Sequence, residues 1–116
     1  MQDFLMLQNV NFIKLARDFL CFLEHLKIHV TIFSEDNGSF TGVVEELDLV
    51  ENAESLEDCI MLLISAMKDY AGDFCSDFDQ WAGASNRKSH VPYVLKIAMS
   101  SSKQLKESIV CRDGEN

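Results

Sequence analysis

The dipeptide Asn37-Gly38 constrains the fold of this chain more than any other feature. Both residue types tolerate positive φ, and an Asn-Gly pair between alternating segments predicts a β-hairpin with a two-residue type I′ turn. Residues 27–34 alternate in polarity and are rich in β-branched side chains, so they predict a strand, and residues 39–46 predict its partner. With a two-residue loop, the expected pairs are Asp36 with Ser39, Phe33 with Gly42 and Ile32 with Val43.

A short apolar segment and a helix are expected after the hairpin. Leu49 and Val50 fit a brief third strand that turns back along the sheet. Ser55 is a good N-cap, and Asp58 three residues later completes most of a capping box. The apolar residues that follow share one helical face: Leu56, Cys59, Ile60, Leu63, Met67, Tyr70 and Phe74. We therefore expect an α+β fold, in which a small antiparallel sheet of about three strands is covered by helices.

An amphipathic helix is predicted over residues 4–26, ahead of the hairpin. Its apolar residues recur at steps of three and four: Phe12, Leu15, Ala16, Phe19, Leu23 and Leu26. Ile13, Leu20 and Phe22 widen this stripe beyond what one neighbour needs. Two interpretations remain open, since spacing cannot separate them: a core helix that packs on the sheet, or a helix that also packs against a second copy of itself.

The C-terminal part, residues 85–110, is expected to be helical. Gly83, Ser85 and Asn86 mark a break, and Pro92, the only proline, suits the first turn of a helix. A helix is favoured over residues 91–99, although a strand is possible there because Val and Tyr are β-prone. Ser102 is a plausible N-cap for a last short helix that runs through Leu105 and Ile109. Residues 112–116 should fray, and with no long linker residues 1–116 are expected to form one domain.

The charge of the chain bears on its partners. The formal net charge is −9, so phosphate backbones and anionic membranes should repel it, whereas a basic partner should be attracted. No apolar run reaches the ~18 residues that a membrane span needs. The N-terminal apolar run lacks the basic start of a signal peptide, because Asp3 stands there. We expect neither nucleic-acid nor membrane binding.

The four cysteines indicate the compartment. Cys21, Cys59, Cys75 and Cys111 are far apart and form no CxxC pair. Cys21 and Cys59 lie in apolar periodic stretches and are predicted to be small core residues, while Cys111 lies near a polar tail. Reduced thiols and a cytoplasmic protein are expected.

No residues stand out as catalytic, metal-binding or cofactor-binding. His25 and His29 lack a third ligand, and a histidine at a helix C-terminus more often serves the helix dipole. Ser89 and His90 are adjacent in the chain, and the side chains of adjacent residues rarely point at each other, so a nucleophile–base pair is not expected there. Carboxylates pair at 35–36, 45–46 and 77/79, but neighbouring strand residues such as Glu45 and Glu46 point to opposite faces. The chain is therefore not expected to be an enzyme or to need a cofactor.

Two further features have a structural and a functional interpretation. Arg87-Lys88 is the one compact basic pair in the middle of the chain, and it is expected to be a solvated loop more often than an anion anchor. The aromatic residues Tyr70, Phe74, Phe78 and Trp81 have helical spacing and favour a core. A stacking platform for bases would need basic residues between the rings, whereas aspartates lie between these.

Residues 28–74 resemble the HicB-like antitoxin domain. That family has a strand, a DEDG turn, a second strand, a PELPGC segment and a GDTLEEA helix start. The matching residues here are Glu35-Asp36-Asn37-Gly38, Glu46-Leu47 and Ala53-Glu54-Ser55-Leu56-Glu57-Asp58. Asp48 and Leu49 replace the family's Pro and Gly, and no ribbon-helix-helix or helix-turn-helix pattern is evident over residues 85–110.

The resemblance implies a scaffold that binds a small basic protein toxin, one that cleaves RNA. It also implies a homodimer or higher oligomer, and the missing DNA-binding module argues against direct operator binding. A second function stays open, in which the same scaffold is a stand-alone regulatory or small-ligand-binding module without a toxin. A basic protein that copurifies would favour the first, and a copurified ligand the second.

Overall fold

The computed structural model describes residues 2–84 and 86–115, with side chains described from Val10 onward except Ala82. Ser85, expected in the central break, lies outside the described residues. The elements in chain order are α1 (Gln2–His25), β1 (Ile28–Ser34), β2 (Phe40–Val44), β3 (Leu49–Ala53), α2 (Leu56–Ser76), α3 (Phe78–Ala82), η1 (Lys88–His90), α4 (Val91–Ala98), α5 (Ser102–Ser108) and β4 (Ile109–Asp113).

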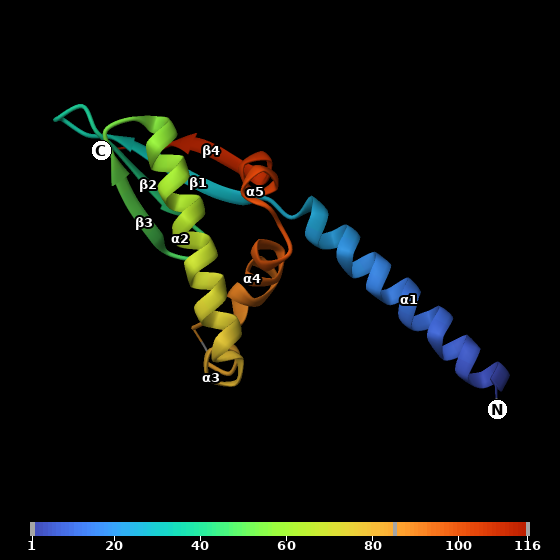
Figure 1. The fold of residues 1–116 in the computed structure, drawn as a ribbon. Coiled ribbons are helices and arrows are strands. Elements are labelled where there is room, and N and C mark those ends of the chain that lie inside the picture. The colour runs from blue at the N-terminus through green and yellow to red at the C-terminus, as the bar shows by residue number, and fades with distance from the viewer. Residues whose placement is uncertain (1, 85, 116) are drawn as a thin grey trace.

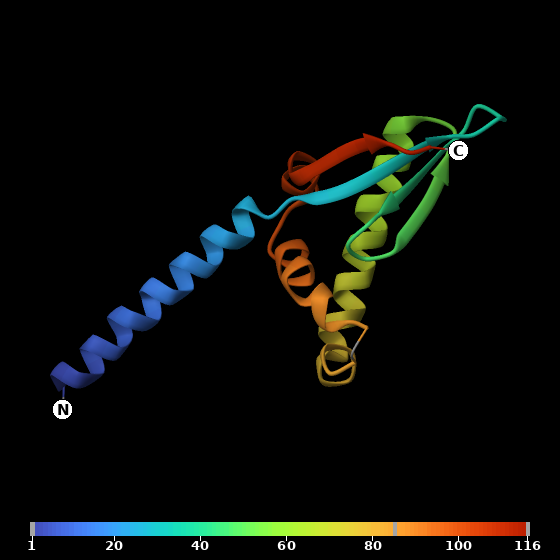
Figure 2. The ribbon, with the colours of Figure 1, turned by 180° about the vertical axis from the view of Figure 1, so that it is seen from behind.

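One mixed sheet forms the centre of the molecule, with strand order β3-β2-β1-β4 (Figures 1 and 2). The pairs β1–β2 and β2–β3 are antiparallel, as expected. Helices α2, α4 and α5 cover one face, where Val30 and Val44 of the sheet share a core with Leu63 of α2, Ile97 of α4 and Leu105 of α5. The expected α+β class is confirmed.

The sheet has one strand more than expected. Ile109 lies at the start of β4 and not inside the last helix, and β4 continues to Asp113, part of a tail expected to fray. This strand runs parallel to β1, with Ile28 beside Ile109 and Ile32 beside Asp113. The pairing joins segments about 80 residues apart in the chain, so no local pattern revealed it.

The hairpin forms where Asn37-Gly38 predicts it, but its register differs from the prediction by one residue. Ser34 lies opposite Phe40 and Ile32 opposite Gly42. Glu35 and Ser39 close the loop, since the Glu35 amide donates to the Ser39 oxygen at 2.9 Å. Only Gly38 in this loop has positive φ, at 87°, which is the geometry of a three-residue loop and not of a type I′ turn.

Helix α2 packs where Gly42 leaves space. A Cβ on Gly42 would lie 2.6 Å from a Leu63 methyl carbon and 2.9 Å from the Cys59 sulfur. The missing side chain therefore makes room for α2. The expected pairing of Gly42 with Phe33 would instead have left room for the Phe33 ring. The predicted start of the helix is confirmed, because the Ser55 hydroxyl accepts the Asp58 amide at 3.1 Å.

The C-terminal helices settle the open assignment of residues 91–99. Val91–Ala98 is the helix α4, with Pro92 in its first turn. Helix α5 is capped by Ser101, one residue before the predicted cap. The Ser101 hydroxyl accepts the Gln104 amide while the Gln104 side chain accepts the Ser101 amide, which is a complete capping box.

Helix α1 does not pack on the sheet, so the expectation of a core helix is wrong. It extends away from the rest of the molecule (Figure 1), so that the molecule with α1 is 69 Å long and only 28 Å by 21 Å in its other dimensions. Cys21, expected in the core, is exposed, whereas Cys59 is buried as expected and Cys111 is exposed. The core over the covered face of the sheet is built from α2, α4 and α5, and no described residue of α1 belongs to it.

Candidate interaction surfaces

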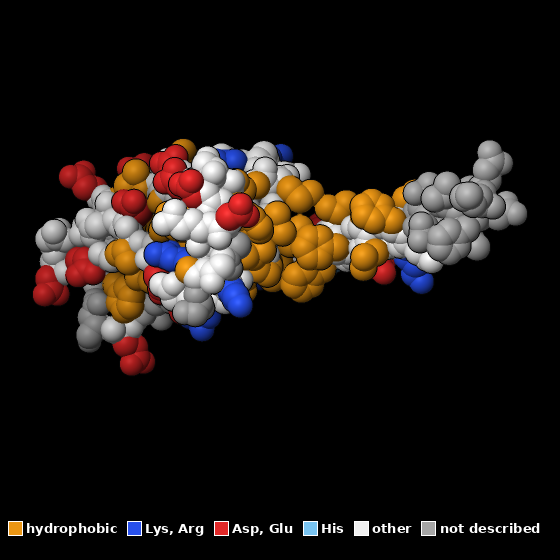
Figure 3. Space-filling view, turned by 90° about the horizontal axis from the view of Figure 1, so that it is seen from below, with side chains coloured by type: hydrophobic (Ala, Val, Ile, Leu, Met, Phe, Trp, Pro, Cys, Tyr) orange, Lys and Arg blue, Asp and Glu red, His pale blue; other side chains and the backbone are white. Residues whose placement is uncertain are grey.

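Helix α1 carries a large apolar surface that the described residues of the chain leave mostly uncovered. The exposed side chains are Val10, Phe12, Ile13, Leu15, Phe19, Leu20 and Phe22, with exposures from 44% to 69%. Figure 3 shows apolar side chains that continue from the junction with the body out along the described part of α1. Contiguous apolar surface of this kind marks a binding site in a folded protein.

The inner end of α1 is anchored by two buried residues. Leu23 is 4% exposed and packs at the junction with α4. From α4, the Lys96 ammonium donates to the main-chain oxygens of Leu23 at 2.7 Å and Glu24 at 3.3 Å. The last carbonyls of a helix lack partners within the helix, so a cation there satisfies them and favours the helix dipole.

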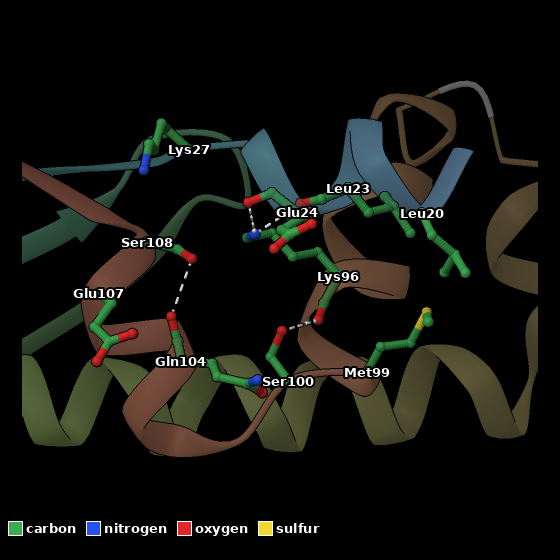
Figure 4. A pocket seen from close by; sticks show the side chains of 10 residues that line it. All are labelled: Leu20, Leu23, Glu24, Lys27, Lys96, Met99, Ser100, Gln104, Glu107 and Ser108. Carbon is green, nitrogen blue, oxygen red and sulfur yellow. Dashed lines mark hydrogen bonds between the residues drawn. The ribbon is translucent and has the colours of Figure 1, made fainter. Parts of the chain in front are cut away.

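Lys96 is 5% exposed, and this burial lowers its pKa. The nearby Lys27 acts in the same direction, while Glu24 opposes the shift. A groove of about 420 Å³ adjoins the anchor and separates the end of α1 from α5 (Figure 4). Sequence reasoning missed Lys96, although a lone lysine inside the apolar segment Val91–Ala98 was a visible indication.

The outer face of α2 is a second exposed surface. Its buried residues face the sheet, and the exposed residues on the opposite side include Asp58, Met61, Leu62, Asp69 and Asp73. We call these five residues the α2 outer stripe. Within the described parts of the chain, none of its three carboxylates has an ion-pair partner within 4.0 Å. The stripe therefore combines negative charge with exposed apolar groups, and Lys68, Lys103 and Lys106 line a pocket with its residues Met61 and Asp69.

The basic pair was expected to be a solvated loop, but Arg87 packs on aromatic rings. Its guanidinium lies 5.7 Å from the centre of the Tyr70 ring and 5.2 Å from that of Trp81. It also donates to the Tyr70 hydroxyl at 3.0 Å. Lys88 is exposed, as expected. The aromatic run is core at Tyr70 and Phe74, whereas Phe78 is 50% exposed.

His90 joins this aromatic cluster. Its Nδ1 lies 2.5 Å from the Tyr70 oxygen, and the imidazole is only 4% exposed. Burial lowers the pKa of His90, and the Arg87 charge lowers it further, while Asp48 opposes the shift. Arg87 donates to the Tyr70 oxygen, and the Tyr70 hydroxyl shares a second hydrogen bond with His90 Nδ1 whose direction depends on the imidazole tautomer. Ser89 is exposed and is not part of this chain of contacts.

The remaining candidate residues have separate partners. His25 Nδ1 lies 2.9 Å from the Cys21 oxygen at the end of α1, where a histidine was expected to serve the helix. His29 Nδ1 lies 2.6 Å from Glu46. Glu45 instead contacts Arg112 at 2.7 Å, so the adjacent carboxylates do not converge. Among the described residues, no group of three or more His, Cys, Asp or Glu side chains could hold a metal ion.

Comparisons with known proteins place the chain in a family. The model of the PHD-like family, described as the antitoxin of RelE/RelB toxin-antitoxin systems, matches residues 6–111. A crystal structure from Syntrophomonas wolfei subsp. wolfei, described as the antitoxin part of a proposed toxin/antitoxin system, superposes with a TM-score of 0.77 at 33% identity. The match covers 84% of this chain and 71% of that one. A search of curated proteins gives no significant match.

The protein thus belongs to the class of antitoxins of toxin-antitoxin systems. The chain is a member of the PHD-like antitoxin family, whose role is regulatory. The antitoxin class implied by the sequence resemblance is confirmed, and the narrower HicB-like identity stays a prediction. No helix in the described residues is both long and apolar enough to cross a membrane.

Proposed function

We propose that this antitoxin neutralises a small basic protein toxin that cleaves RNA, and that it does so without enzymatic activity of its own, in the cytoplasm, as a homodimer or higher oligomer. The proposal treats residues 1–116 as one domain, from which α1 extends. The order β1, β2, β3, α2 over residues 28–74 supports the HicB-like likeness as part of the proposal.

The distribution of charge is the observation that carries the proposal. Residues 1–27 contain three acidic and three basic side chains, so the whole net charge of −9 lies on residues 28–116. A basic partner is attracted to that body and not to α1. The net charge also disfavours contact with a nucleic-acid backbone, so we do not propose direct DNA binding.

The α2 outer stripe is the part of the body that best fits such a partner. Asp58, Asp69 and Asp73 are exposed and can pair with toxin cations without breaking an ion pair of the antitoxin. Met61 and Leu62 lie between them and are 58% and 43% exposed, which supplies the apolar contact that charge alone lacks. Electrostatic attraction speeds the encounter, and apolar burial slows dissociation.

Coexpression with the product of the adjacent gene tests the proposal. A small basic protein should copurify with the chain, arrest growth when produced alone and cleave RNA in vitro, and the chain should relieve the arrest and the cleavage. The proposal fails if no basic protein copurifies and no growth arrest needs rescue.

A charge-reversal pair tests the surface. The double variant Asp69→Lys/Asp73→Lys should weaken toxin binding at least tenfold, because it places like charges opposite a basic partner. The matched control is Glu35→Lys/Asp36→Lys at the hairpin, which changes the net charge by the same amount on another part of the body. Equal weakening by both pairs would show a response to net charge alone and would exclude the α2 outer stripe.

A further inference from the structure

The exposed apolar residues of α1 follow a heptad-like repeat in the sequence. Phe12, Leu15, Phe19, Phe22 and Leu26 are separated by steps of three, four, three and four residues. This spacing averages 3.5 residues, and it keeps an apolar seam facing a second helix along its whole length. Phe12, Leu15, Phe19 and Phe22, which we call the α1 seam, are all exposed, at 69%, 67%, 44% and 53%.

The outer part of the seam lies beyond the contacts that anchor the helix to its own body. Leu23, which packs at the body, is four residues after Phe19 on the same side of the helix, so the anchor borders the inner end of the seam. Phe22 also lines a pocket with Tyr93 of α4. Lys96 holds main-chain oxygens at the end of the helix and no seam side chain. The helix can therefore stay anchored while the seam contacts another molecule.

We propose that the α1 seam is the surface on which two copies of this chain associate, as a two-stranded coiled coil. The repeat specifies a helix as the partner, and a second α1 is a helix with the same repeat. The charge distribution favours the same occupant, since residues 1–27 are neutral in sum and two copies of α1 do not repel each other. A basic toxin gains no electrostatic attraction from α1, and the acidic body offers it a better surface.

The size of the seam fits a weak dimer. From the ~150–250 Å² of an aromatic side chain and the exposures above, burial of the α1 seam removes on the order of 400 Å² per copy. A standard interface buries about 800 Å² per partner, so the seam alone makes a small interface. We expect dissociation in the micromolar range.

Sedimentation equilibrium of the purified full-length chain, without a toxin, tests this inference. It deepens the self-association part of the proposed function and is independent of the toxin part. The wild-type chain of 13.2 kDa should give a dimer mass at concentrations above about 10 µM. Leu15→Gln should raise the dissociation constant at least tenfold, since two leucines leave the interface of each dimer.

Val10→Gln is the matched control. Val10 is 61% exposed, close to the 67% of Leu15, and lies on the opposite side of α1 from the seam. It should change the dissociation constant by less than threefold. Circular dichroism should show the same helix content and melting temperature for the body in both variants, because neither side chain is buried.

Several outcomes would overturn the inference. A monomer mass for the wild type at 100 µM would exclude the dimer. A dimer that survives Leu15→Gln would locate the interface on the body. Equal weakening by both variants would indicate general stickiness of α1. If both proteins are monomers and Leu15→Gln instead abolishes toxin binding, the occupant of the seam is the toxin.

Discussion

The ammonium of Lys96 lies 2.7 Å from the main-chain oxygen of Leu23, and this contact ties α1 to α4 across more than 70 residues of chain. We expect it to hold the end of α1 in its direction relative to the body. Burial lowers the pKa of Lys96, and since a buried charge carries a desolvation cost, we expect the contact to contribute orientation more than global stability.

Replacement of Lys96 by Met should therefore loosen α1 without unfolding the body. We expect amide exchange over residues 21–27 to become about three- to tenfold faster, since the loss of a hydrogen bond from a charged donor weakens the local structure by roughly 1 kcal/mol. The free energy of unfolding should change by less than about 1 kcal/mol. Hydrogen exchange and urea titration measure the two quantities, with the exposed Lys103→Met as control. Unchanged exchange at the end of α1 would contradict the anchoring role.

His90 should make stability depend on pH. Its folded-state pKa is lowered by burial and by Arg87, so the unfolded chain binds a proton that the folded chain does not over the range just below pH ~6.5. The free energy of unfolding should thus fall as the pH decreases through that range, by at most about 1.4 kcal/mol per pH unit. Urea titrations between pH 5.5 and 7.5 measure the slope. His90→Gln should flatten it, and the exposed His25→Gln should not.

Two glycine-to-alanine changes should have opposite signs. Gly42→Ala places a Cβ 2.6 Å from a Leu63 carbon, so it should destabilise the fold by about 1–3 kcal/mol. Gly72 lies in α2 with open space around it, so Gly72→Ala should stabilise by about 0.8–1 kcal/mol through its better helix propensity. Thermal and urea unfolding provide both values. A neutral Gly42→Ala would mean that α2 can shift away from β2 at little cost.

The two basic residues of the central loop should differ in their contribution to stability. Arg87→Ala removes contacts with the Tyr70 and Trp81 rings and a hydrogen bond to the Tyr70 hydroxyl. We expect a loss of about 1–2 kcal/mol in the free energy of unfolding. Lys88→Ala, next in the chain and exposed, should cost less than about 0.5 kcal/mol. Equal effects of the two changes in urea titrations would show that the ring contacts contribute nothing.

The hairpin shows which features of a turn the local sequence can predict. Asn37-Gly38 located the turn correctly, because glycine is needed where φ is positive. It did not determine the loop length, since Asn-Gly serves a two-residue loop and a three-residue loop alike. The resulting shift of one residue moved Gly42 from Phe33 to Ile32. A close approach of α2 over Gly42 could not be foreseen from the strand pattern alone.

The sequence by itself determined the local elements of this antitoxin: the hairpin at Gly38, the cap at Ser55, the helix begun by Pro92 and the apolar period of α1. These depend on backbone preferences and on contacts between residues a few positions apart. The tertiary structure alone decided that Ile109–Asp113 pairs with β1 and that Lys96 holds the end of α1. It also left the α1 seam exposed among the described residues of the chain. An apolar period shows that a helix buries one face, but only the packing of all other elements shows whether the chain supplies the covering surface.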